Sequence, residues 1–173
     1  MKKPGATQAS SPAYFETAFV TTVLRSFINT PPDQLIARLG YGGLLPFAGL
    51  TALTWLVRAD LVPFVAAALV AYSALIASFL GGIHWGIGFK RLQSGEPLVN
   101  FHFLWGITPS LLAWVALVMP PLAGLPLLGL VLLGCYGVDR KTYPPAGLRR
   151  WLTLRFHLTV VATLSCILSA AAV

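Results

Sequence analysis

Five long apolar stretches, separated by short polar segments, constrain this chain more than any other feature of its sequence. They cover residues 39–57, 62–89, 102–119, 122–138 and 151–172. A helix of about 20 apolar residues crosses a hydrocarbon core of roughly 30 Å, and each stretch has or approaches that length. The sequence therefore predicts an all-α, polytopic membrane protein, folded as a compact bundle of five transmembrane helices.

The composition supports a membrane protein and argues against a nucleic-acid-binding one. The chain is 57% hydrophobic and only 10% charged, whereas a soluble domain carries about 25% charged residues. The net charge of +7 comes from basic residues in short segments between the apolar stretches, where they meet lipid headgroups. We therefore expect the lipid bilayer as a partner, with room for other membrane protein subunits, and no nucleic acid.

The basic residues also predict an orientation. With five spans, one side of the membrane would hold Lys2, Lys3, Arg25, Arg38, Lys90, Arg91, Arg140, Lys141, Arg149, Arg150 and Arg155. The other side would hold Arg58. Because basic residues in short loops favour the cytoplasmic side, this asymmetry predicts a cytoplasmic N-terminus and a C-terminus across the membrane.

The first 30 residues are expected to form an N-terminal extension to a membrane domain of residues 31–173. Residues 1–12 are polar and rich in helix breakers, which is typical of disorder. No apolar core follows the two N-terminal lysines, so the segment does not resemble a signal peptide. Residues 14–28 carry Phe15, Phe19, Val23 and Phe27 along one helical stripe. They are expected to form either an interfacial helix or a loosely ordered tail.

The second apolar stretch is predicted to be the central helix. Small residues recur along one of its faces, and such a stripe lets a second helix approach closely inside a bilayer. The residues expected to pack helices together are Ser78, Gly81, Gly82, Gly86 and, in the third stretch, Pro109. Because this stretch is longer than a bilayer core requires, its helix must tilt, project beyond the membrane or break, and Gly81-Gly82 is where a break would fall.

Two histidines form the first part of a candidate polar site. His84 and His102 lie toward the cytoplasmic ends of consecutive antiparallel spans, so they could face each other. Two neutral imidazoles could ligate haem iron or a transition metal; alternatively, each hydrogen-bonds within the bundle or at the headgroups. We expect His84 to be neutral, hydrogen-bonded and pointed into the bundle. The neighbouring Trp85 would also need a partner for its indole N–H.

Asp139 and Arg155 form the second part of the candidate site. Arg155 projects on the same helical face as Thr159 and Thr163, which we expect to be the interior face. An unpaired guanidinium there would be costly, and Asp139 is its natural partner; the alternative is an arginine that extends to the membrane edge. His157 lies on a different face, which is expected to be directed toward lipid.

Several kinds of chemistry have no sequence signature in this chain. No Asp, Glu, Lys or Arg lies near the middle of an expected span, as proton-coupled carriers usually require. No phosphate-binding loop, nucleophile elbow or metalloprotease helix occurs either. These absences predict no catalytic residues. We expect a non-catalytic accessory, scaffold or assembly component. The alternative is a small-molecule, haem or ion-binding or transport protein with its site near His84 and His102.

Four short strings resemble a known membrane family. They are residues 39–47 (LGYGGLLPF), 78–86 (SFLGGIHWG), 109–114 (PSLLAW) and 154–159 (LRFHLT). They are similar to DUF3429, an uncharacterised family that includes bacterial inner-membrane proteins and the mitochondrial transmembrane protein 69 group. The resemblance covers roughly residues 39–170. It implies a small multi-span fold in a bacterial inner membrane and brings no activity with it.

Overall fold

The computed structural model describes residues 30–173, and all regular secondary structure in that range is helical. The elements are α2 (Pro32–Gly42), α3 (Leu44–Leu56), α4 (Val62–Ser94), α5 (Val99–Val118), α6 (Pro121–Thr142), the short 3₁₀ helix η1 (Arg149–Trp151) and α7 (Leu152–Ala170). Residues 1–29 of the expected N-terminal extension lie outside the described residues, and so does the interfacial helix or loosely ordered tail expected over residues 14–28. The chain divides into two units after Leu39, and the helical bundle belongs to the second unit, Gly40–Val173.

Five helical segments in the described range are long and apolar enough to cross a membrane. They are Pro32–Leu56, Val62–Ser94, Val99–Val118, Pro121–Thr142 and Arg149–Ala170. The predicted fold class, a five-span all-α membrane protein, is confirmed. Two helices extend beyond the expected spans, because α4 continues through the basic residues to Ser94 and α6 continues to Thr142.

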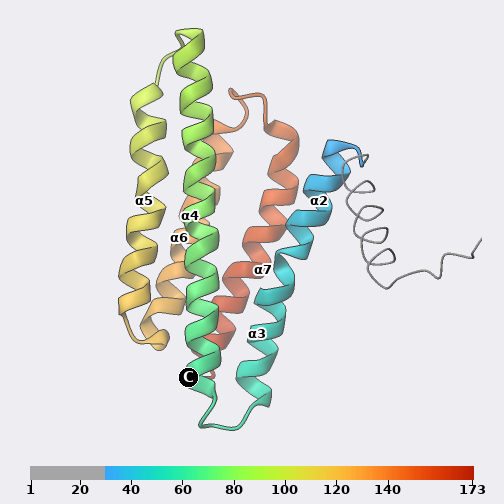
Figure 1. Ribbon diagram of the computed structural model, residues 1–173, viewed down its shortest axis with the longest axis vertical. Helices are drawn as coiled ribbons and strands as arrows, with labels where there is room; N and C mark the ends of the chain where they lie inside the picture. Colours follow the sequence, from blue (N-terminus) through green and yellow to red (C-terminus); the bar gives the residue numbers. More distant parts are fainter. Residues whose placement is uncertain (1–29) are drawn as a thin grey trace, which may run out of the picture. The chain divides into compact units, whose positions relative to one another are not determined.

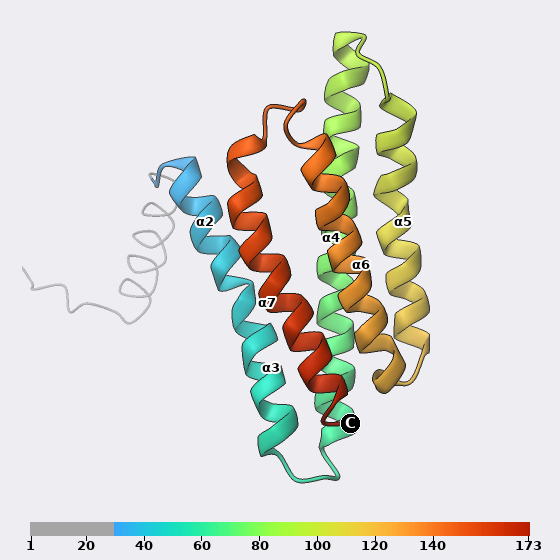
Figure 2. The ribbon, with the colours of Figure 1, turned by 180° about the vertical axis from the view of Figure 1, so that it is seen from behind.

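Helix α4 is the centre of the bundle, as predicted, since it packs against α3, α5, α6 and α7. Figures 1 and 2 show helices α3 to α7 running side by side, with successive connections at alternating ends. The α4–α5 and α6–α7 connections lie at one end, and the α3–α4 connection and the C-terminus lie at the other (Figure 1). The core between these helices includes Phe47, Leu69, Leu125, Leu128 and Leu132.

Of the three alternatives for this long stretch, a break at Gly81-Gly82 does not occur, because α4 is one continuous helix from Val62 to Ser94. A glycine in a helix interior costs about 1 kcal/mol. Breaking the helix would leave backbone groups without partners in hydrocarbon, and each of those costs several kcal/mol. Close packing of Gly81 against α5 gives a further reason to keep the helix intact.

Within the bundle, Gly82 and Gly86 do not make the helix contact expected of them. Both residues are exposed, and no neighbouring atom lies within 4 Å of a Cβ built at either position. The contact with α5 is made by Gly81, where a Cβ would collide with the carbonyl oxygen of Gly106. Successive residues on a helix differ by about 100° in direction, so a one-residue difference decides which glycine meets α5.

Hydroxyl groups join α3 to α7 in the half of the bundle near the C-terminus. Thr51 Oγ1 donates to the carbonyl oxygen of Ser165 at 3.3 Å, and Ser169 Oγ donates to Thr51 Oγ1 at 3.2 Å. Thr54 Oγ1 lies 3.4 Å from Ser169 Oγ. Such hydrogen bonds are a recurrent means of association between membrane helices, and here they hold α7 against the first span.

Candidate functional site

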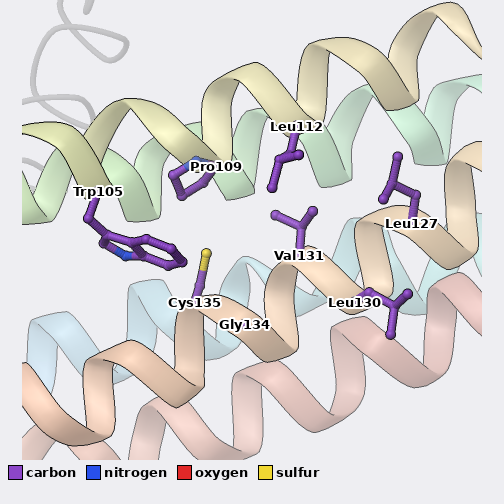
Figure 3. Close-up of a pocket in the computed structure, with 8 residues that line it drawn as sticks. All are labelled: Trp105, Pro109, Leu112, Leu127, Leu130, Val131, Gly134 and Cys135. Atoms are coloured by element: carbon purple, nitrogen blue, oxygen red, sulfur yellow. The ribbon is translucent and has the colours of Figure 1, made fainter.

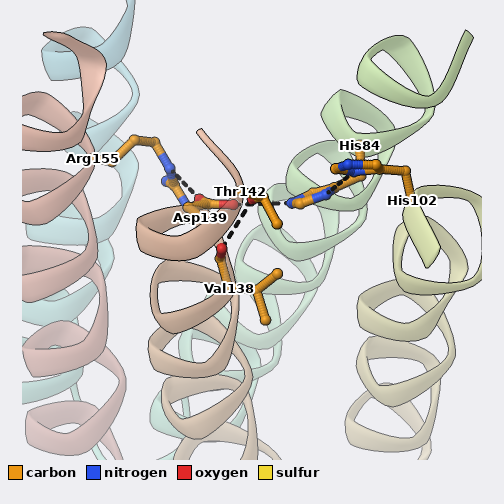
Figure 4. A network of polar contacts seen from close by, with 6 residues as sticks. All are labelled: His84, His102, Val138, Asp139, Thr142 and Arg155. Carbon is orange, nitrogen blue, oxygen red and sulfur yellow. Dashed lines mark hydrogen bonds and ion pairs between the residues drawn. The ribbon is translucent and has the colours of Figure 1, made fainter. Parts of the chain in front are cut away.

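Four polar side chains form one buried chain that crosses four helices. Figure 4 shows them in order from α7 to α5: Arg155, Asp139, His84 and His102. Arg155 Nε donates to Asp139 Oδ2 at 2.9 Å, and Arg155 Nη2 lies 2.8 Å from the same oxygen. His84 Nε2 lies 3.1 Å from Asp139 Oδ1, and the Nδ1 atoms of His84 and His102 are 3.1 Å apart. We call these four residues the polar chain.

The polar chain is buried along its whole length. His84, His102 and Asp139 are each 1% exposed, and Arg155 is 8% exposed. A buried carboxylate is tolerable only when it is paired and hydrogen-bonded. Here one oxygen of Asp139 faces the guanidinium and the other faces an imidazole, so both oxygens have partners.

The positions of these residues follow from local packing. The sites of Gly81 and Gly88 on α4 leave room for α5, since a Cβ at Gly88 would lie 3.3 Å from the Cβ of His102. That close approach brings the two imidazoles together. Asp139 lies in the last turn of α6 and Arg155 in the first turn of α7. Because a short connection joins these two helix ends, the ion pair forms where the chain turns back.

Aromatic side chains surround the polar chain. The Trp105 ring meets His84 edge-on with 6.4 Å between ring centroids, and the Tyr143 ring lies 6.3 Å from His84. Tyr143 follows the end of α6 and is 3% exposed. Burial, and then the negative charge of Asp139, raise the pKa of the Tyr143 hydroxyl above its ordinary value, while Arg155 acts in the opposite direction.

The structure brings together four of the five expected polar-site residues and leaves out Trp85. The Trp85 side chain is 39% exposed and makes edge contacts with the rings of Phe89 and Phe103. A Cβ at Gly106 would collide with the Trp85 ring, so Trp85 covers the α4–α5 contact instead of joining the polar chain. Of the remaining expected packing residues, Pro109 is buried and Ser78 is partly exposed.

Sequence reasoning missed two residues near the polar chain, Trp105 and Tyr143. Trp105 lies three residues after His102, and residues three apart share a helix face. The spacing of His102 and Trp105 therefore indicates that both side chains lie on the same face of α5. Tyr143 lies in a charged connection that the sequence predicts to be a loop, and no periodic pattern there indicates burial. Its position depends on how that connection folds back over the bundle.

His157 is exposed, which agrees with the lipid-directed face expected for it, and it also contacts a tyrosine. Its Nδ1 lies 3.0 Å from the hydroxyl oxygen of Tyr41, and this contact is exposed. The rings of Tyr41 and His157 are stacked, with centroids 6.5 Å apart. His157 therefore has a polar partner, but it lies outside the polar chain.

An apolar cavity of about 190 Å³ lies between α5 and α6 (Figure 3). Its lining includes Trp105, Pro109, Val131 and Cys135. Within the described part of the chain, the buried Trp105 Nε1 has no hydrogen-bond partner. None of the residues that line the cavity is charged.

The polar chain is suited to holding or passing protons. No group of three or more His, Cys, Asp or Glu residues within the described range is arranged to hold a metal ion. The two imidazoles contact each other directly through their Nδ1 atoms, which are 3.1 Å apart. Imidazoles and a carboxylate in a hydrogen-bonded row can exchange protons without further groups.

Comparisons with known proteins agree with the architecture. Residues 32–171 match the family described as "Protein of unknown function (DUF3429)". Transmembrane protein 69 of Xenopus tropicalis is 37% identical over 139 residues, which cover 75% of this chain and 51% of that protein. The chain thus spans about half the length of this curated relative. No solved structure matches the chain.

Proposed function

Since the chain belongs to the DUF3429 family and is a multi-pass membrane protein, we propose that it is a non-catalytic accessory or assembly component that docks a transmembrane helix of another membrane protein. One observation carries this proposal. Gly82 and Gly86 of α4 are exposed, with no neighbouring atom within 4 Å of a Cβ at either site. A Gly-x-x-x-Gly pair facing outward offers a surface on which a second helix can approach closely.

The surface beside these glycines supports the same function. One helical stripe on α4 connects Ala71, Leu75, Ser78, Gly82 and Gly86, which are spaced by three or four residues. The first three of these residues line a groove of about 330 Å³ between α4 and α5. We call the stripe and groove together the α4–α5 face. Its small side chains would let a docked helix gain van der Waals contact with both α4 and α5.

Site-directed photo-crosslinking in the native membrane tests the docking. A photoreactive amino acid at Ser78, which lines the groove, is expected to capture a second membrane protein. Gly82→Leu should reduce that adduct at least about tenfold, because the added side chain blocks close helix approach. Gly49→Leu on α3 is the matched control, since Gly49 is also exposed and has no neighbouring atom within 4 Å of its Cβ position.

The control should retain the wild-type yield of the adduct. An adduct that survives Gly82→Leu unchanged would contradict docking on this face. Adducts formed only with lipid or with a second copy of this chain would contradict a distinct partner protein.

We also propose that the protein lies in a bacterial inner membrane with its N-terminus in the cytoplasm and its C-terminus in the periplasm. Lys90 and Arg91 at the end of α4 lie at the same end of the bundle as the α6–α7 connection, which carries Arg149 and Arg150 (Figure 1). Arg58 is in the α3–α4 connection at the opposite end. This distribution supports the orientation. A reporter that functions only in the periplasm should be active when it is fused after Val173. Activity of a reporter that functions only in the cytoplasm, fused at the same position, would refute this orientation.

A further inference from the structure

The polar chain lies on the side of α4 that faces the bundle, and the docking proposal does not use it. His84 falls between Gly82 and Gly86 in sequence but is 1% exposed, whereas both glycines are exposed. We propose that His84 and His102 form a proton-binding site, in which one additional proton is shared between the two imidazoles with Asp139 as its counterion. This proposal is independent of the docking function.

Hydrogen bonding determines where the protons lie in the neutral site. Asp139, held as an anion by Arg155, can only accept at Oδ1, so His84 Nε2 donates to it. A neutral imidazole with its proton on Nε2 has a lone pair on Nδ1. His102 must then donate from its own Nδ1, because the two Nδ1 atoms are 3.1 Å apart.

This arrangement leaves a lone pair on Nε2 of His102, which is where an additional proton binds. The N–H bond formed there makes His102 an imidazolium. Its Nδ1 proton can then transfer to Nδ1 of His84, so one N–H bond breaks and another forms while His102 becomes neutral again. The positive charge has now moved one ring closer to Asp139, with no change in the number of electrons.

The surrounding charges make this binding reversible. Asp139 on α6 attracts the additional proton, but Arg155 on α7 already neutralises that carboxylate at 2.8 Å. Burial disfavours a positive charge on His102, and Arg91 on α4 opposes it as well. Within the described residues, α5 contains no Asp, Glu, Lys or Arg, and the nearby Cys135 and Tyr143 are buried. Because Arg155 stabilises the carboxylate anion, the proton remains on the imidazoles.

Nuclear magnetic resonance of the full chain in lipid nanodiscs, with ¹⁵N-labelled histidine, tests the proposal. Spectra are recorded between about pH 5 and pH 8, the range in which histidine changes charge. The ring nitrogens of His84 and His102 are expected to shift together in a single step that corresponds to one proton. His157, which contacts Tyr41 outside the polar chain, provides an internal reference in the same spectra.

The wild-type spectra alone test whether His84 and His102 share one proton. The proposal is overturned if the His84 and His102 signals stay constant across this range while His157 titrates, or if the two histidines titrate in separate, unlinked steps.

Two variants then locate the counterion. Asp139→Asn keeps an acceptor at this position and removes the charge, so the shared step should move at least about one pH unit lower. His157→Gln should leave the step unchanged. An unchanged step in folded Asp139→Asn would contradict the role of Asp139.

Discussion

Asp139 and Arg155 form an ion pair inside the helical bundle, with 2.8 Å between Oδ2 and Nη2 and side chains that are 2% and 10% exposed. The pair joins the end of α6 to the start of α7. A third group, His84, occupies the other carboxylate oxygen and extends the connection to α4. One carboxylate therefore joins the end of α6 and the start of α7 to the interior of α4.

Removing one member of this pair should be strongly destabilising. Asp139→Asn or Arg155→Gln leaves its partner charged, buried and uncompensated, which costs about 3–5 kcal/mol of the free energy of unfolding. The double variant should lose less than the sum of the single variants. Denaturant unfolding in detergent micelles measures all three losses as a double-mutant cycle.

The exposed pair Arg58–Asp60 is the matched control. Its side chains are 85% and 60% exposed, and Arg58→Gln should change the free energy of unfolding by no more than about 1 kcal/mol. Equal losses for Arg155→Gln and Arg58→Gln would show that the buried pair does not connect α6 and α7 energetically.

Two adjacent glycines should respond very differently to the same substitution. Gly81→Ala places a methyl group against the carbonyl oxygen of Gly106, so α4 and α5 must move apart at a cost of about 1–3 kcal/mol. Gly82→Ala faces open space and should raise stability by up to about 1 kcal/mol, because alanine is the better helix former. Thermal unfolding of both variants in the same detergent checks this difference, and equal midpoints would contradict the observed α4–α5 contact.

His84 and His157 should also respond very differently to the same substitution. His84→Leu removes two hydrogen-bond partners inside the bundle and leaves Asp139 Oδ1 and His102 Nδ1 without theirs. We expect a loss of about 2–6 kcal/mol, since each of the two buried groups left without a partner costs roughly 1–3 kcal/mol. His157→Leu breaks an exposed contact with Tyr41 and should cost about 1 kcal/mol or less. Chemical unfolding of the two variants compares them, and a larger loss for His157→Leu would refute this ranking.

Tyr143 should resist ionisation in alkaline solution. Its pKa is raised by burial and by Asp139, so the folded state holds the hydroxyl proton more tightly than the unfolded state, whose pKa is about 10. The corresponding stabilisation is complete below about pH 10 and is lost as the pH rises through the folded-state pKa. In Tyr143→Phe the stability should fall less steeply above about pH 10 than in the wild type.

Ultraviolet absorbance measures the ionisation directly. The difference between wild-type and Tyr143→Phe spectra should show no tyrosinate signal at about pH 10, the ordinary midpoint for tyrosine. A tyrosinate signal in that difference spectrum at this pH would show that the Tyr143 side chain is accessible to water.

Much of the candidate site could be predicted from the sequence because its constraints are local. Arg155 shares a helix face with Thr159 and Thr163, and both threonines are buried. A charged residue on such a face requires a counterion, and Asp139 is the acidic residue at the adjacent helix end. The expectation that His84 and His102 could face each other rested on their positions in consecutive antiparallel helices. The structure brings all four residues together.

The sequence by itself determined the five spans, because the length of an uncharged apolar stretch against the thickness of a bilayer needs no information about neighbouring helices. Tertiary structure decided how each helix is rotated about its axis. Gly81 packs against Gly106 whereas Gly82 faces outward, and Trp105 lies beside His84 whereas Trp85 does not. Adjacent residues on a helix differ by about 100°, and only the combined packing of α4 against α3, α5, α6 and α7 selects one rotation.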